Sequence, residues 1–119
     1  MVAVFQTPLT AEEVKSRAKR LGADLVGIAD GKVMNENPPY PDDPRRPSDI
    51  SDYDADRVIV LARRINIGSS RIIKWNERHK YYNDELTITA LEETALELVL
   101  WFEENGHPAL IVPPTHVDP

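Results

Sequence analysis

The chain of 119 residues contains no cysteine. Without thiols it can form no disulfide, no thiolate zinc site and no cysteine-ligated iron–sulfur cluster of its own. It also lacks long hydrophobic runs, since none approaches the roughly 20 apolar residues that a membrane-spanning helix requires. The opening segment Met1–Phe5 lacks the basic start and long apolar stretch of a secretory signal. We therefore expect a soluble protein, and the absence of cysteine fits a cytoplasmic location.

Basic residues are outnumbered, because 14 Lys and Arg against 20 Asp and Glu give a formal net charge of -6. This balance disfavours a nucleic-acid surface, which needs clustered Lys and Arg. One local stretch is nevertheless basic and has aromatic residues within it: Arg63, Arg64, Arg71, Lys74, Trp75, Arg78, Lys80, Tyr81 and Tyr82. Such a stretch could contact a phosphate-bearing ligand or nucleic acid, or could be a charged loop whose aromatic rings pack inward.

A capping signal and helical periodicity mark the first regular element. Thr10 and Glu13 stand at the spacing of a capping box, in which each side chain satisfies a backbone N–H of the other residue. Apolar residues then recur at helical spacing and predict a helix over residues 11–21. Gly22 follows as the expected left-handed cap.

The rest of the chain predicts strands and a second helix around a long irregular segment. Short, nearly continuous apolar runs indicate strands covered on both faces, whereas clustered prolines disfavour a long helix. In order, the expected elements are a strand at 24–29, a proline-rich loop at 32–56, a strand at 57–62, a helix at 82–104 and a strand at 109–112. We expect them to form the N-terminal part of a single α/β domain over residues 1–119. This arrangement indicates a partial α/β sandwich with at least one crossover connection.

Six aspartates lie between Asp42 and Asp56 in the loop. The last of them are spaced like the first three ligands of a helix–loop–helix calcium site. That site also needs Gly and Glu at positions where this chain has Arg57 and Arg63. We therefore interpret the segment as a solvated acidic loop.

Other catalytic patterns are absent or incomplete. The three histidines, His79, His107 and His116, form no His-x-x-x-His pair and no zinc signature. The sequence contains no P-loop, no G-x-G-x-x-G fingerprint and no G-x-S-x-G elbow. From residue patterns alone, the chain is an α/β module without a complete catalytic or metal-binding set.

One segment carries a resemblance that extends this interpretation. The run from Glu12 through Leu21-Gly22-Ala23-Asp24-Leu25-Val26-Gly27-Ile28-Ala29 resembles the opening of the epoxyqueuosine reductase and reductive dehalogenase group. The similarity continues through the proline-rich segment, the strand at 56–62 and Tyr82. It then extends through Gly106-His107-Pro108-Ala109 into Pro113-Pro114. It thus covers nearly the whole chain, in motifs that are mostly structural.

The resemblance implies a fold similar to the nitroreductase-like corrinoid-binding domain, incomplete in this chain. It also implies a corrinoid (cobalamin) and two [4Fe–4S] clusters in the complete assembly, held by another part of the same protein or by a second subunit. Tyr82, with Tyr81 beside it, is the residue that would face the corrinoid or substrate cavity; the alternative is that both rings pack at the helix entrance. The reductases have a Tyr-His pair here, whereas this chain has Tyr82-Asn83, which weakens the case for tRNA modification.

Three functions follow as hypotheses. The first is the N-terminal part or subunit of a corrinoid and iron–sulfur dependent reductase, possessing no complete active site and acting on a small molecule. The second is a non-catalytic protein-binding or assembly module that uses the proline-rich loop 32–56. The third is a small flavin-binding or nitroreductase-like subunit, for which the sequence supplies no phosphate-binding motif.

Overall fold

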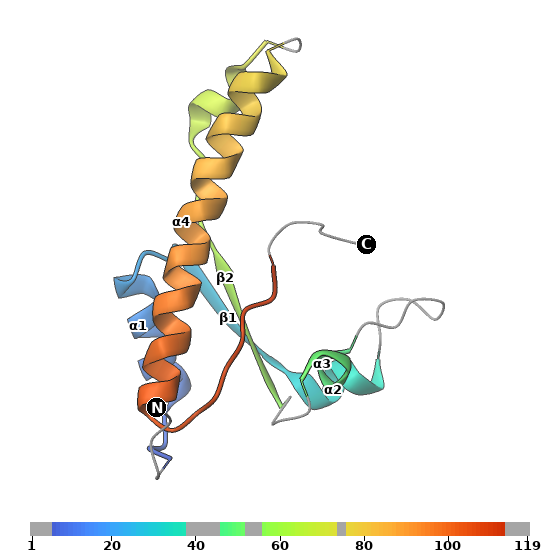
Figure 1. Ribbon diagram of the computed structural model, residues 1–119, viewed down its shortest axis with the longest axis vertical. Helices are drawn as coiled ribbons and strands as arrows, with labels where there is room; N and C mark the ends of the chain where they lie inside the picture. The colour runs from blue at the N-terminus through green and yellow to red at the C-terminus, as the bar shows by residue number, and fades with distance from the viewer. Residues whose placement is uncertain (1–5, 38–45, 52–55, 74–75, 114–119) are drawn as a thin grey trace. The chain divides into compact units, whose positions relative to one another are not determined.

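The structure is a computed structural model and describes residues 6–37, 46–51, 56–73 and 76–113 (Figure 1). Its elements in chain order are α1 (Ala11–Arg20), β1 (Leu25–Asp30), α2 (Gly31–Glu36), α3 (Pro47–Ile50), β2 (Arg57–Ala62), the 3₁₀ helix η1 (Ile67–Arg71) and α4 (Glu77–Glu104). They fall into two compact units: Met1–Leu25 with Leu61–Pro119, and Val26–Val60. The described residues form a mixed α/β protein, as the sequence predicts.

Helix α1 begins and ends where the sequence signals place it. The Glu13 backbone N–H donates to Thr10 Oγ1 at 3.1 Å, and the Thr10 N–H donates to Glu13 Oε1 at 3.4 Å, which completes the capping box. At the other end Gly22 has φ of 124°, a conformation that favours glycine. Val14 and Ala18 are the buried residues of the helix.

The core of the first unit lies where α1 packs against α4. Ala18 of α1 is fully buried and Leu98 of α4 is 3% exposed. Beside them, the Arg17 guanidinium lies 5.1 Å from the centre of the Trp101 ring, a cation–π contact that anchors one edge of the interface. The two helices lie side by side in Figure 1.

Helix α4 is longer than its apolar periodicity predicts. It begins at Glu77, five residues before the expected start at 82, and ends at Glu104 as predicted. The added turn contains only charged and polar residues before Tyr81, so hydrophobic spacing gives no signal for it; the Asn76 carbonyl accepts the N–H groups of His79 and Lys80. Among the described helices, none is long and apolar enough to cross a membrane.

Strands β1 and β2 form an antiparallel two-stranded sheet. The Asp24 N–H donates to the Ala62 carbonyl at 2.9 Å, and the Gly31 N–H donates to the Asp56 carbonyl at 2.8 Å at the other end of the pair. Along β1, Val26 is half-buried, whereas the neighbouring Leu25 and Gly27 are exposed. The prediction of strands covered on both faces is therefore wrong for the described residues, because an antiparallel pair needs only one covered face.

The loop expected over 32–56 contains two short helices within its described parts. Pro47 is the first residue of α3, a position whose backbone N–H has no partner within the helix. The missing N–H of proline therefore has no cost there, and this proline favours a helix. Asn35 of α2 joins the two: the Arg46 Nε–H donates to its carbonyl at 2.8 Å, and the Ser48 N–H donates to its Oδ1 at 3.0 Å. Residues 38–45 and 52–55 of the expected loop lie outside the described residues.

The predicted strand at 109–112 is not formed. These residues follow the α4 cap at Gly106, whose φ is 84°, without regular secondary structure. An apolar run becomes a strand only when a neighbouring strand accepts its backbone hydrogen bonds, and the sheet of the described residues contains β1 and β2 alone. The sequence predicted a sandwich with at least one crossover connection, and among the described residues the two paired strands are antiparallel and form none.

Candidate functional site

Tyr81 and Tyr82, the predicted cofactor-facing residues, lie in the second turn of α4. Their side chains are 65% and 63% exposed, so the alternative of rings packed inward at a helix entrance does not apply. Adjacent residues on a helix point about 100° apart. The two rings therefore face different directions.

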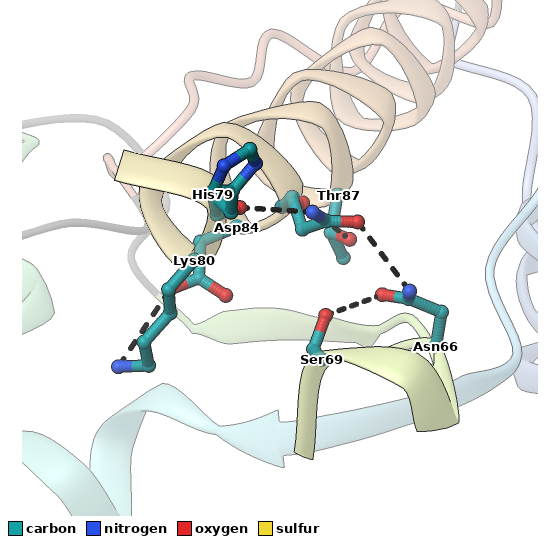
Figure 2. Close-up of polar contacts among 7 residues, drawn as sticks. Asn66, Ser69, His79, Lys80, Asp84 and Thr87 are labelled. Atoms are coloured by element: carbon teal, nitrogen blue, oxygen red, sulfur yellow. Dashed lines mark hydrogen bonds and ion pairs between the residues drawn. The ribbon is translucent and has the colours of Figure 1, made fainter. Parts of the chain in front are cut away.

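Asn83 stands next to Tyr82, where the resembling reductases have histidine. Its Nδ2 donates to the His79 carbonyl at 2.8 Å, and its Oδ1 accepts from Asn66 Nδ2 at 3.4 Å. Ser69 Oγ extends this hydrogen-bond network by donating to Asn66 Oδ1 at 2.6 Å (Figure 2). The amide thereby joins η1 to α4, and it has no titratable proton with which to act as a general acid or base.

The charged residues around this polar cluster make exposed, local pairs. Lys80 Nζ lies 4.0 Å from the Asp84 carboxylate one turn along α4 (Figure 2), and such exposed pairs contribute about 0.3–0.5 kcal/mol. In the described part of the chain, no three His, Asp or Glu side chains gather in a way that could hold a metal ion.

The remaining sequence-predicted groups are dispersed. His107 Nε2 lies 2.7 Å from the Thr7 carbonyl and joins the chain before α1 to the end of α4. In the acidic segment, Asp49 accepts from the Arg46 N–H and Asp56 lies 3.8 Å from Lys32, so these two carboxylates serve separate local contacts. Asp42, Asp43, Asp52, Asp54, Lys74, Trp75, His116 and Asp118 lie outside the described residues.

A polar joint that sequence reasoning missed connects the end of α1 with the middle of α4. Thr94 is buried, and its hydroxyl lies 3.0 Å from the Leu21 carbonyl and 3.1 Å from the Ala90 carbonyl. Arg63, from the basic stretch, donates from Nη1 to the Gly22 carbonyl at 2.7 Å. The sequence did contain a signal for this joint, because Thr94 stands among the apolar residues of a predicted helix. A hydroxyl buried at such a position needs a hydrogen-bond acceptor.

An open depression of about 500 Å³ lies beside this joint. Glu93, Leu96 and Glu97 of α4 line it, together with Arg63. It is open on one side and carries both signs of charge, so it suits an extended surface contact better than an enclosed small-molecule site.

The cofactors implied by the resemblance fit this chain to different extents. The absence of cysteine leaves no thiolate for an iron–sulfur cluster, so the clusters do not fit here. For a corrinoid, the described residues offer an exposed tyrosine ring and no enclosing pocket, so they supply at most one wall. No protein-family model, curated protein or solved structure matches the chain.

Proposed function

We propose that this chain is a scaffold portion of a corrinoid and iron–sulfur dependent reductase, similar to epoxyqueuosine reductases and reductive dehalogenases. The observation that supports it is the segment formed by α1, the left-handed Gly22 and β1, which carries the most distinctive part of the resemblance. In the nitroreductase-like domain of such a reductase, this segment would support a cavity wall.

Tyr82 is the residue we assign to that wall. It is exposed, and it belongs to a helix that Asn83 and Asn66 fasten to η1, so its backbone is held while its ring stays accessible. When bound, the corrinoid supplies the redox chemistry through its cobalt. Tyr82 would contact and orient whatever occupies the cavity, and the clusters would come from cysteine-bearing parts of the assembly.

Exposed apolar side chains support a role within an assembly. Among the described residues, large apolar side chains stay accessible on β1, on β2, in and around η1 and after α4: Leu25, Val60, Ile65, Ile67, Ile73, Leu110, Ile111 and Val112. Where accessible apolar groups are contiguous, they mark surfaces that another polypeptide covers. The proposal assigns that cover to the remaining parts of the reductase.

Purification of the tagged chain from its source tests the proposal. We expect an assembly larger than 13.5 kDa with corrinoid bands and the broad visible absorption of thiolate-ligated clusters. Tyr82→Ala should lower the corrinoid content of that assembly, whereas Tyr81→Ala, which points about 100° away, should leave it unchanged. A colourless 13.5 kDa species would overturn the proposal.

The protein-binding module is the second candidate. Val33, Met34 and Ile50 are exposed on the short helices α2 and α3, which Asn35 holds together. These side chains could bind a partner protein without any cofactor. A colourless complex that is lost on changing Val33 and Met34 to Ser would favour this function over the reductase.

A further inference from the structure

Helix α4 carries an exposed apolar face opposite the side that packs on α1. Leu86, Leu96 and Leu100 are 53%, 49% and 45% exposed, whereas Leu98 of the same helix is buried. With 3.6 residues per turn, these three leucines fall within about 80° of one another and extend over about 21 Å. We call these three residues the leucine face.

Carboxylates dominate the positions on and beside the leucine face. From residue 85 to its end, α4 contains no Lys or Arg, and its acidic residues are Glu85, Glu92, Glu93, Glu97, Glu103 and Glu104. With about 100° per residue, Glu93 lies between the leucines of the leucine face. Glu97 and Glu104 flank one side of the face, and Glu85, Glu92 and Glu103 flank the other side. The result is an apolar stripe bordered by negative charge.

This charge distribution is unfavourable for α4 alone. The C-terminal end of a helix carries a partial negative charge, so carboxylates in the last turn destabilise it and cations there stabilise it. The last turn of α4 has Glu103 and Glu104 and no basic residue. A positively charged partner along the helix would offset this repulsion.

The depression beside the joint adds a recess to the same surface. Leu96 belongs to the leucine face and also lines the depression, together with Glu93 and Glu97. A recess beside an apolar stripe can accept a long side chain. Arg63 also lines the depression and donates one hydrogen bond to the Gly22 carbonyl, so the two carboxylates outnumber the one cation there.

We propose that the leucine face binds a basic amphipathic helix of a partner protein. The partner's apolar residues at helical spacing would cover Leu86, Leu96 and Leu100, and its Lys and Arg would contact the flanking carboxylates, in the manner of an amphipathic helix docking in a groove. The charge complementarity selects this occupant over a second copy of the chain, whose own α4 would bring carboxylates against carboxylates. The inference concerns the surface of α4 and the depression beside it, and it holds whether or not the assembly binds a corrinoid.

The test is fluorescence anisotropy with the complete chain and a labelled 18-residue helical peptide of Leu at i, i+3, i+4 and i+7 and Lys elsewhere, about 27 Å long. We expect saturable binding that weakens on raising the salt to about 1 M, where the Debye length is about 3 Å. The same peptide with Glu in place of Lys should not bind.

Matched variants separate a docking surface from general attraction to an acidic protein. Leu96→Ala should raise the Kd roughly tenfold, as expected for loss of an anchor side chain, whereas Ser16→Ala at an exposed site of α1 should leave it unchanged. Glu93→Gln with Glu97→Gln should raise the Kd about threefold, whereas Glu12→Gln with Glu36→Gln, which removes the same charge elsewhere, should not.

Three results would overturn the proposal. They are no binding of the basic peptide, equal weakening by both carboxylate pairs, and a concentration-dependent dimer in sedimentation that Leu96→Ala abolishes. Circular dichroism of each variant confirms that a loss of binding does not reflect a loss of helix.

Discussion

At the scale of single residues, close contacts constrain the joint between α1 and α4. Gly22 is required there for two reasons. Its φ of 124° disfavours a side chain, and a Cβ would lie 2.9 Å from Arg63 Nη1 and 3.1 Å from Thr94 Oγ1. The turn that joins α1 to the sheet thus depends on the absence of a side chain.

Gly22→Ala should accordingly destabilise the protein by about 1–3 kcal/mol, because the substitution places an L side chain in left-handed backbone. Gly27→Ala is the matched control, since a Cβ at Gly27 meets nothing within 4 Å and its φ is ordinary. Urea titrations followed by far-ultraviolet circular dichroism give both values. Equal stabilities of the two variants would contradict the geometry described for Gly22.

Thr94→Val tests the buried hydroxyl of the same joint. The change keeps the shape of the side chain but removes the donor to the Leu21 carbonyl, so we expect a loss of about 1–2 kcal/mol. Thr89→Val, at an exposed position of α4, should change stability by less than about 0.5 kcal/mol. A neutral Thr94→Val would mean that the Leu21 carbonyl finds another donor.

At the scale of elements, sequence patterns succeeded where the determinants are local. The capping box, the left-handed glycine and both paired strands lie within about a residue of their predicted positions, since each depends on neighbours in the sequence. The strand at 109–112 was wrong because strand formation depends on a distant partner. Tyr82 was predicted at the start of the correct helix, whereas Tyr81 fell just before its predicted start. The exposure of both rings, and the Asn83 contact to Asn66, depend on which segments meet.

Thr10→Ala tests the capping box of α1. The substitution removes the side-chain oxygen that accepts the Glu13 N–H, so we expect a loss of about 1 kcal/mol. Ser16→Ala, at an exposed site within the same helix, should be neutral or slightly stabilising, because alanine has the higher helix propensity. Thermal melts of the two variants provide the comparison, and equal shifts of Tm would argue against a stabilising cap.

At the scale of the whole molecule, the described residues bury few apolar side chains. The buried ones are Val14, Ala18, Ala23 and Leu98, and none of the large side chains is fully enclosed. A two-stranded sheet adds little by itself, because stable sheets need more strands or a packed face. Because so few apolar side chains are buried within the chain, both the proposed assembly and the proposed helix partner would supply surfaces that cover the exposed ones.

The isolated 119-residue chain should therefore unfold with low cooperativity and bind a hydrophobic dye before it melts. Leu98→Ala should abolish any residual transition, because deleting a buried leucine costs about 2–5 kcal/mol. Leu100→Ala, two residues along the same helix but 45% exposed, should leave the transition in place. Calorimetry at two protein concentrations, with dye fluorescence on the same samples, measures these effects. A sharp two-state melt that does not depend on concentration would show that Val14, Ala18, Ala23 and Leu98 suffice as a core, and would remove the stability argument for a partner.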